Sequence, residues 1–294
     1  MSYAPCPYNS MKHLLCTLIL FVFPMTLFAA DANRPQKREF FALCMDTHDE
    51  KQRPIEEQNK MLAELGFDGV AHLWLDKLDE RVASARSVKI HVAQVYIQVD
   101  LSKNPPFDPK LKEALPCLKG EKSQLALLIY GGQPSDESLD DKAVEIIQEI
   151  VSIAEPNEVQ VVLYPHVSAW NETVADCVRI AKRFPEKKVG VMFNLCHWAA
   201  VDKSDNLKKT LEAAMPHLAC ITINGTDTPE EIQARADRAG WLQPLDAGSF
   251  DQKKLLTILD ELGYSGPVGL QCYGIPGDAE IHLKRSMKKW REMQ

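Results

Sequence analysis

Side chains that could bind a small molecule or move a proton accompany a series of short β-branched runs in this sequence. His166, His197 and Asp46 each end such a run, and imidazole and carboxylate groups are the usual proton carriers near neutral pH. Amide, phenol and hydroxyl groups occupy related positions at Tyr164, Asn194, Thr222, Asn224, Gln271, Tyr96 and Tyr273. Such groups combine flat apolar faces with directional hydrogen bonds, which suits a carbohydrate. We therefore expect the two histidines and Asp46 to be catalytic and the other residues to bind a small carbohydrate.

Eight such runs alternate with amphipathic helical stretches. They span residues 40–46, 69–73, 91–101, 124–130, 159–166, 189–197, 219–225 and 267–274. Strands that alternate with helices form parallel sheets, and eight units close a (βα)8 TIM barrel, an α/β fold. An open doubly wound sheet is the alternative, but it usually has a glycine-rich turn after its first strand, where this chain reads MDTHDEKQ. In a barrel the C-terminal strand ends share one rim, which would gather the polar residues into one pocket.

Composition limits the classes of partner. The chain has 294 residues, 45% of them hydrophobic, with 34 basic and 41 acidic side chains and a net charge of −7. This size allows a single barrel domain with a full core. Basic residues form no stripe and there is no glycine-rich phosphate loop, so we expect no nucleic-acid partner.

The N-terminal segment differs from the rest. Residues 14–28 form an apolar run that follows Lys12 and ends before two alanines. A charged start, a short apolar centre and small residues at the end are typical of a secretory signal. Residues 1–30 are therefore predicted to be a signal peptide (Met11 is an alternative start), residues 31–38 a loose tail and residues 39–294 the barrel. The protein is expected to be exported to the periplasm or the extracellular space, with no membrane contact after cleavage. A retained membrane anchor is the alternative.

Six cysteines that follow the predicted signal peptide and one further histidine complete the set of reactive side chains. An exported protein can form disulfides, but most of these cysteines lie in predicted strands, where cysteine often serves as a small core residue. Buried thiols are therefore favoured over disulfides. His282 lies on the predicted last helix, residues 278–291, and is expected at the surface.

Residues 159–291 resemble the xylose-isomerase-like TIM barrel family, also known as the sugar phosphate isomerase/epimerase group. The segments VVLYPHVSAW, VGVMFNLCHW, ACITINGTD and WLQPLDAGSFDQKKLLTILDELGYSGPVGLQCY occur in the order and spacing of the family's metal-site strands. The resemblance implies a TIM barrel and sugar isomerase or epimerase chemistry.

The resemblance also implies a divalent metal held by Glu, Asp, His and Glu. Those positions are Tyr164, Asn194, Thr222 and Gln271 in this chain, so the usual ligands are replaced. Amides keep the shape of carboxylates but lose the charge that holds Mn²⁺ or Mg²⁺. No metal is therefore expected. If Mn, Mg or Zn binds at all, His166 and His197 would hold it with a third ligand such as Asp46 or His48.

Three functions remain open from the sequence. The first is a sugar isomerase or epimerase in which a rim histidine or Asp46 moves a proton next to a carbonyl group. The second is a metal-free, non-catalytic carbohydrate-binding barrel, which the lost ligands favour. The third is a hydrolase or lyase acting on a modified sugar, for which Asp46 and Asp246 are the available carboxylates.

Overall fold

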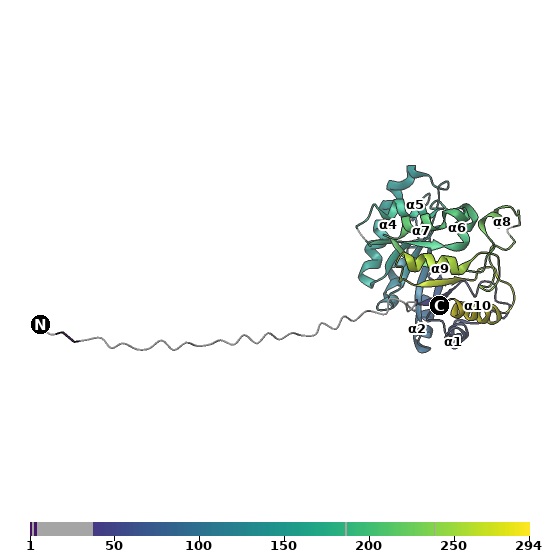
Figure 1. Ribbon diagram of the computed structural model, residues 1–294, viewed down its shortest axis with the longest axis horizontal. Coiled ribbons are helices and arrows are strands. Elements are labelled where there is room, and N and C mark those ends of the chain that lie inside the picture. Colours follow the sequence, from purple (N-terminus) through teal and green to yellow (C-terminus); the bar gives the residue numbers. More distant parts are fainter. Residues whose placement is uncertain (2, 5–37, 186, 238) are drawn as a thin grey trace. The chain divides into compact units, whose positions relative to one another are not determined.

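The computed structural model describes residues 1, 3, 4, 38–185, 187–237 and 239–294. Parallel strands close into one barrel in the order β1 to β8, which confirms the predicted fold (Figure 1). The strands are β1 (Phe40–Leu43), β2 (Gly69–Leu73), β3 (His91–Asp100), β4 (Gln124–Tyr130), β5 (Gln160–Leu163), β6 (Val189–Asn194), β7 (Leu218–Ile223) and β8 (Val268–Gln271). The ring closes where β1 pairs with β8, which sets Leu43 beside Gln271.

Helices and short 3-10 turns connect the strands. The helices are α1 (Ile55–Leu65), α2 (Leu78–Ser87), α3 (Leu111–Ala114), α4 (Asp140–Ala154), α5 (Val174–Ala181), α6 (Leu195–Val201), α7 (Leu207–Ala214), α8 (Pro229–Gln233), α9 (Gln252–Glu261) and α10 (Ala279–Met293). The 3-10 turns are η1 (Leu115–Leu118), η2 (Glu137–Leu139), η3 (Glu155–Asn157) and η4 (Ser204–Asn206). The first and last helices, α1 and α10, pack side by side (Figure 1).

Side chains on alternate strand positions fill the barrel interior. Gln94 on β3 reaches Met192 on β6, with 3.6 Å between Nε2 and Sδ, although these strands are not neighbours. Interior residues include Phe41, Ala71, Ala126, Val162 and Cys220, a mixture of large and small side chains. The other strand face is aliphatic and packs under the helices as the larger core. This two-sided burial explains why the strands read as continuous apolar runs.

Six strands end one to three residues earlier than the sequence predicts. Among them, β5 ends at Leu163, β6 at Asn194 and β8 at Gln271. β6 stops because the side chain of Asn194 caps α6, accepting a hydrogen bond from the backbone N–H of His197 at 3.3 Å. His197 therefore lies in the first turn of a helix and not on a strand.

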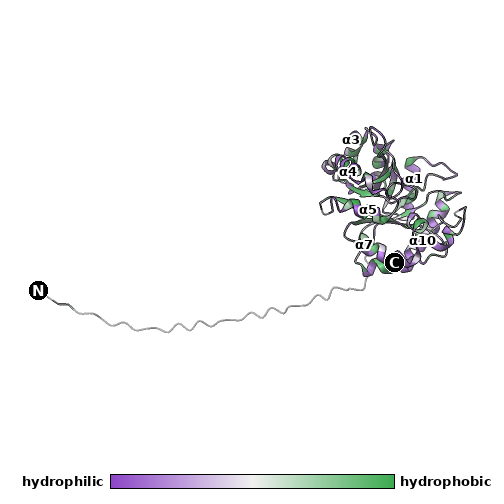
Figure 2. Cartoon of the chain, turned by 90° about the horizontal axis from the view of Figure 1, so that it is seen from above, coloured by the Kyte–Doolittle hydropathy of each residue, from purple (hydrophilic) through white to green (hydrophobic). Residues whose placement is uncertain are grey.

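The last helix, α10, corrects one expectation. Its buried residues recur every three or four positions, and its ribbon in Figure 2 alternates between hydrophobic and hydrophilic colours. His282 belongs to this buried face and is 4% exposed, so its predicted surface position is wrong. The helical repeat that places Leu283 and Met287 toward the core also turns His282 inward.

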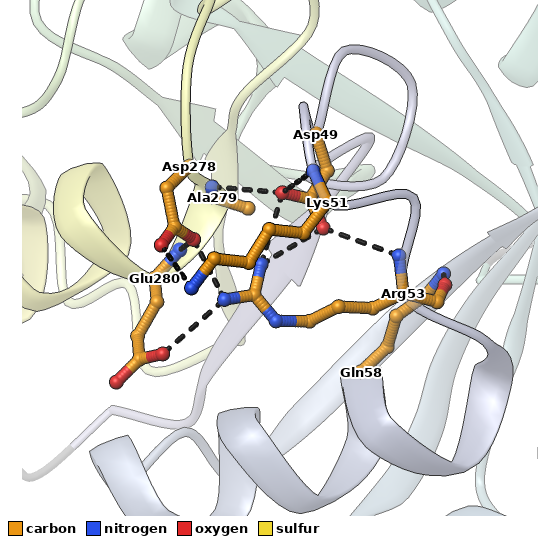
Figure 3. A network of polar contacts seen from close by, with 7 residues as sticks. All are labelled: Asp49, Lys51, Arg53, Gln58, Asp278, Ala279 and Glu280. Atoms are coloured by element: carbon orange, nitrogen blue, oxygen red, sulfur yellow. Dashed lines mark hydrogen bonds and ion pairs between the residues drawn. The ribbon is translucent and has the colours of Figure 1, made fainter.

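A charged network joins the first and last loops on the C-terminal side of the barrel (Figure 3). The Arg53 guanidinium donates to Asp49 at 2.9 Å and to Asp278 at 2.6 Å, and Lys51 lies 2.7 Å from Asp278. Asp49 also accepts a hydrogen bond from the Ala279 backbone N–H at 3.1 Å. Because β1 and β8 are far apart in sequence, these bonds fasten the seam at which the barrel closes.

The N-terminal predictions concern residues that the structure mostly leaves undescribed. The signal peptide and nearly all of the 31–38 tail lie outside the described residues. Arg38, the last residue of that tail, is buried, and its guanidinium bonds Asp260 and the Tyr264 carbonyl oxygen. No helix among the described residues has the length and apolar character needed to cross a membrane.

All six cysteines of the described barrel are thiols, and five of them are buried, as the sequence predicts. Burial raises the pKa of the Cys196 and Cys272 thiols well above the usual value. These groups stay protonated at neutral pH and serve as small core side chains.

Candidate active site

The phenolic oxygen of Tyr164 is a meeting point for polar side chains from three βα connections. Tyr164 directly follows β5, and its side chain is buried. Its oxygen lies 2.9 Å from Nδ2 of Asn194, at the end of β6. It also lies 3.0 Å from Nε2 of His197 on α6 and 3.4 Å from Nε2 of Gln271 at the end of β8. Three of the four family-aligned positions therefore converge on one atom.

Backbone contacts fix the orientation of both amides. The oxygen of Asn194 accepts from the backbone N–H of His197, and the oxygen of Gln271 accepts from the backbone N–H of Tyr273 at 3.1 Å. A backbone N–H can only donate, so each amide must present its NH₂ group to Tyr164. The phenolic oxygen therefore accepts two hydrogen bonds.

The position of the Tyr164 proton follows from this arrangement. With both lone pairs of the oxygen in use, the hydroxyl hydrogen points to Nε2 of His197, which must be an acceptor. His197 is thus the neutral tautomer that carries hydrogen on Nδ1. Burial raises the pKa of Tyr164 well above its usual value, which keeps the phenol protonated.

His166 is the more accessible of the two site histidines. Its Nδ1 donates to the Val167 carbonyl oxygen at 2.8 Å, which leaves Nε2 as the basic atom. Its ring packs against that of His197 with 3.9 Å between centroids. Burial lowers the pKa of His166, opposed in part by the Val167 bond, so the imidazole is neutral at pH 7 and can accept a proton.

Two buried asparagines position the loops of the site. Asn171 donates to the Tyr164 carbonyl oxygen at 3.1 Å and accepts from the Ile129 backbone N–H at 3.3 Å, which ties the loop after β5 to β4. Asn224, after β7, donates to the Trp241 carbonyl oxygen at 3.0 Å and so holds the loop that carries Trp241. The indole N–H of Trp241 in turn donates to the Cys196 carbonyl oxygen.

A cavity of about 420 Å³ opens at this rim of the barrel. Its wall consists mainly of aromatic and aliphatic side chains with a few neutral polar groups: Leu43, Cys44, Leu73, Trp74, Tyr96, Gln98, Leu128, Tyr130, Tyr164, His166, Val167, Ser168, Cys196, His197, Trp241, Leu242, Gln271 and Tyr273. None of these lining residues is Asp, Glu, Lys or Arg. The volume suits a small molecule, and the wall favours an uncharged one.

The structure brings together most of the residues expected from sequence. Six of them line the cavity: Tyr96, Tyr164, His166, His197, Gln271 and Tyr273. Asn194 lies behind the Tyr164 hydroxyl and is fully buried. Thr222 and Asn224 are also fully buried and are absent from the cavity wall.

The two rim carboxylates lie away from the cavity wall. The Asp46 side chain is 38% exposed and lies 3.7 Å from the Arg81 guanidinium. Asp246 accepts from Arg285 at 2.9 Å. Neither residue lines the cavity.

Sequence reasoning missed Trp74 and Trp241, which line the cavity from the loops after β2 and β7. A tryptophan one residue beyond a predicted strand end was the available signal for Trp74. Trp241 carried no such signal, because it lies eighteen residues beyond the end of β7 and is held at the rim by the Asn224 and Cys196 contacts.

A divalent metal does not fit this set of donors. Tyr164, Asn194, Thr222 and Gln271 bring no negative charge, and two NH₂ groups point at the centre where a cation would need oxygen atoms. The alternative pair fits no better, because Tyr164 engages Nε2 of His197 and no carboxylate among the cavity-lining residues could join Nε2 of His166. Within the described residues no three His, Cys, Asp or Glu side chains are grouped to hold a metal.

A family model described as xylose isomerase-like TIM barrel matches residues 120–293, more than half of the chain. The chain belongs to this family. The match covers β4 to β8 and therefore every residue that converges on Tyr164. No curated protein matches the sequence significantly.

Solved structures of the same fold are similar at low sequence identity. D-psicose 3-epimerase from Clostridium cellulolyticum H10 has a TM-score of 0.65 and 15% identity, over 87% of this chain and 99% of that one. 3-Keto-D-glucoside 4-epimerase from E. coli has a TM-score of 0.67 and 16% identity, over 87% and 100%. A zinc-bound IOLI protein has a TM-score of 0.69 and 17% identity, over 87% and 97%. At these identities the likeness shows the fold.

Proposed function

We propose that this protein is a metal-independent sugar isomerase that uses His166 as its base. The observation that carries the proposal is a neutral, accessible imidazole on the wall of an uncharged aromatic cavity at the catalytic rim of the barrel. Two observations support a carbohydrate ligand. The chain belongs to the xylose isomerase-like family, and its fold is similar to those of two sugar epimerases.

The cavity chemistry favours a neutral sugar over a sugar phosphate. A phosphate group needs cationic side chains or a cluster of backbone N–H donors, and no Lys or Arg lines the cavity. Indole and phenol rings at Trp74, Tyr130 and Tyr273 offer flat apolar surfaces, and Gln98 and Gln271 offer amide hydrogen bonds. A sugar ring has matching apolar faces and hydroxyl edges.

The proposed reaction moves one proton between adjacent carbon atoms. Nε2 of His166 removes a proton from the carbon next to the carbonyl group, while the carbonyl oxygen accepts a hydrogen bond from Tyr130. Burial raises the pKa of Tyr130, so its phenol remains a donor at neutral pH. The imidazolium then returns the proton to the former carbonyl carbon. Tyr130 passes its phenolic proton to the former carbonyl oxygen and regains one from the hydroxyl group on the neighbouring carbon, which becomes the new carbonyl, so an aldose and a ketose interconvert without net gain or loss of atoms.

The positions of the histidines favour isomerisation over epimerisation. Inversion at one carbon by two bases needs proton carriers on opposite faces of the substrate. The rings of His166 and His197 lie in contact, with 3.9 Å between their centroids, and so belong to one wall, and Nε2 of His197 is engaged by Tyr164. His197 is in this view a positioning residue for Tyr164.

Hydrogen exchange tests this proposal directly. The protein is incubated in D₂O with glucose, mannose, fructose, xylose and ribose, and NMR follows deuterium at the carbon next to the carbonyl group. We expect exchange and interconversion of one aldose–ketose pair, unaffected by EDTA, and a loss of about 10²-fold in His166→Gln. His91→Gln, at the start of β3, is the matched control and should keep full activity. Exchange that survives His166→Gln, or that EDTA abolishes, would refute the mechanism.

A non-catalytic carbohydrate-binding barrel is the second candidate. The specific observation in its favour is that no carboxylate lines the cavity, so His166 is the one base with an accessible nitrogen among the described wall residues. Saturable sugar binding without deuterium exchange in the same samples would select this candidate.

Export is a separate part of the proposal and is supported by the apolar run at residues 14–28. We propose cleavage after Ala29 or Ala30 and release of the barrel to the periplasm or the exterior. N-terminal sequencing of the protein from its native cells should give a start near Asp31. An intact N-terminus in the cytoplasmic fraction would contradict export and would leave the site chemistry untouched.

A further inference from the structure

A second cavity of about 570 Å³ adjoins the first. Trp74, Gln98 and Tyr130 line both cavities, so the two spaces share a wall. The second cavity continues from this shared wall over the loop after β3, where Pro105, Pro106 and Phe107 lie. The candidate site and the second cavity therefore lie side by side at the rim.

Trp74 has a strained backbone at the junction of the two cavities. Its φ angle is +68°, in the left-handed region that bulky residues rarely adopt. The strain is held by a hydrogen bond from its backbone N–H to the Tyr96 carbonyl oxygen at 2.9 Å. The side chain is nevertheless 42% exposed, so core packing does not account for the conformation. Strain that keeps an aromatic ring in a cleft points to ligand contact.

The second cavity has the mixed chemistry of a sugar-binding surface. Proline and phenylalanine side chains form its apolar part. Asp100, Lys103 and Asp108 line its polar part. Lys103 pairs with Asp100 at 3.2 Å, so the charges of these two residues largely cancel. Hydroxyl groups can donate to these carboxylates and accept from the ammonium group.

We propose that the natural ligand is a neutral glycoside of at least two sugar units that spans both cavities. The reactive unit lies beside His166, and the next unit stacks on Trp74 and extends over Pro106 and Phe107. This inference rests on the proposed function and specifies its substrate class. Trp74 acts as a specificity determinant that selects a disaccharide or longer chain over a free monosaccharide.

Binding measurements with matched sugars test the inference. Isothermal titration calorimetry compares glucose, galactose, mannose and xylose with their α- and β-linked di- and trisaccharides. At least one disaccharide should bind about tenfold more tightly than its component monosaccharides, since burying one apolar sugar face on an indole is worth about that factor.

Trp74→Gly should abolish the difference, because it should weaken disaccharide binding more than monosaccharide binding. Glycine suits the Trp74 variant because it accepts the positive φ and keeps the backbone N–H. Lys77→Gly is the matched control, because Lys77 lies in the same β2–α2 loop with a φ of +54° and does not line either cavity. It should behave as wild type, and Trp74→Phe should restore part of the disaccharide preference.

The outcomes separate this inference from the proposed function. Monosaccharide binding without any gain from a second unit, or a gain that persists in Trp74→Gly, overturns the glycoside inference and leaves the isomerase proposal standing. Failure of every sugar in the panel to bind overturns both.

Discussion

Nε2 of His197 lies 3.0 Å from the phenolic oxygen of Tyr164 and accepts a hydrogen bond from its hydroxyl group. This bond completes a neutral hydrogen-bonded centre. The centre lies at the positions to which the family resemblance assigns metal ligands. Its donors and acceptors hydrogen-bond one another without a charged group: two amide NH₂ groups, one hydroxyl and one imidazole nitrogen.

Removal of the Tyr164 hydroxyl should destabilise the protein more than removal of an ordinary buried tyrosine hydroxyl. Tyr164→Phe leaves Asn194, Gln271 and Nε2 of His197 without this partner, which should cost about 2–3 kcal/mol of unfolding free energy. Tyr264→Phe is the control, since its hydroxyl group donates to the Pro267 carbonyl oxygen at 2.7 Å and lies outside the cavity wall, and it should cost about 1 kcal/mol. Urea denaturation measures both. Equal costs would mean that the Tyr164 contacts contribute little.

Metal removal should leave the wild-type protein unchanged. We expect the same thermal midpoint with EDTA and with added Mn²⁺, because the site presents NH₂ groups toward its centre. The triple change Tyr164→Glu, Asn194→Asp and Gln271→Glu should instead give a Mn²⁺-dependent stabilisation of about 2–3 kcal/mol at metal concentrations near a hundred times Kd.

The double variant Asn194→Asp and Gln271→Glu is the matched control for metal binding, and it should respond less because the Tyr164 phenol still fills the centre. An EDTA-sensitive wild type would show that the two histidines hold a metal after all.

The activity of His166 should persist to lower pH than that of an ordinary histidine base. Burial lowers the pKa of His166, and a base is active when deprotonated, so the acid limb of kcat/KM should lie below about pH 6.5. A pH–rate profile on the sugar found by deuterium exchange measures this limb. An acid limb at or above the usual histidine value would assign the base to another group.

Buried His282 should make stability depend on pH. Burial lowers the pKa of His282 from 6.5 to about 4, opposed in part by the nearby charges of Asp49 and Asp278, while Arg285 lowers it further. The unfolded chain therefore takes up the proton first, and this contribution to stability is full above pH 6.5 and is lost as pH falls toward 4.

The change His282→Leu should remove this pH dependence, as measured by urea denaturation at several pH values between those limits. His91 provides the comparison, because the Glu39 hydrogen bond raises its pKa and gives the opposite sign. A wild-type protein with flat stability across this window would contradict the burial of His282.

The seam network of Figure 3 should weaken in acid. Hydrogen bonds from Lys51 and then Arg53 lower the pKa of Asp278 from 3.8 to about 2. The unfolded carboxyl is protonated first, so this stabilisation is present above pH 3.8 and is lost as pH falls toward 2. Asp278→Asn keeps a helix-capping side chain for α10 but removes the charge. Its loss of unfolding free energy relative to wild type should therefore become smaller as pH falls from 3.8 toward 2.

Asp141→Asn is the control for the seam network, since that carboxylate is 91% exposed, and it should show little difference from wild type at any pH. If the difference in unfolding free energy between Asp278→Asn and wild type stayed constant down to pH 2, the charge of the carboxylate would not be its cause.

The sequence by itself determined the barrel and the list of side chains at its rim. Short segments that are apolar on both strand faces, such as QLALLIY at β4, alternate with helices whose apolar residues recur at helical spacing. Few folds are compatible with that pattern. The same alternation placed Tyr164, His166 and Gln271 at C-terminal strand ends, where they line the cavity.

Only the tertiary structure decided how those side chains interact. Asn194 faces Tyr164 because it caps α6, a helix that the sequence reading had merged into a strand. Trp241 reaches the rim through a long loop, and Trp74 stays in the cleft through a bond to the neighbouring strand. Sequence spacing tells which residues share a face, whereas proton positions, tautomers and cavity walls depend on contacts between residues far apart in the chain, which only the closed barrel creates.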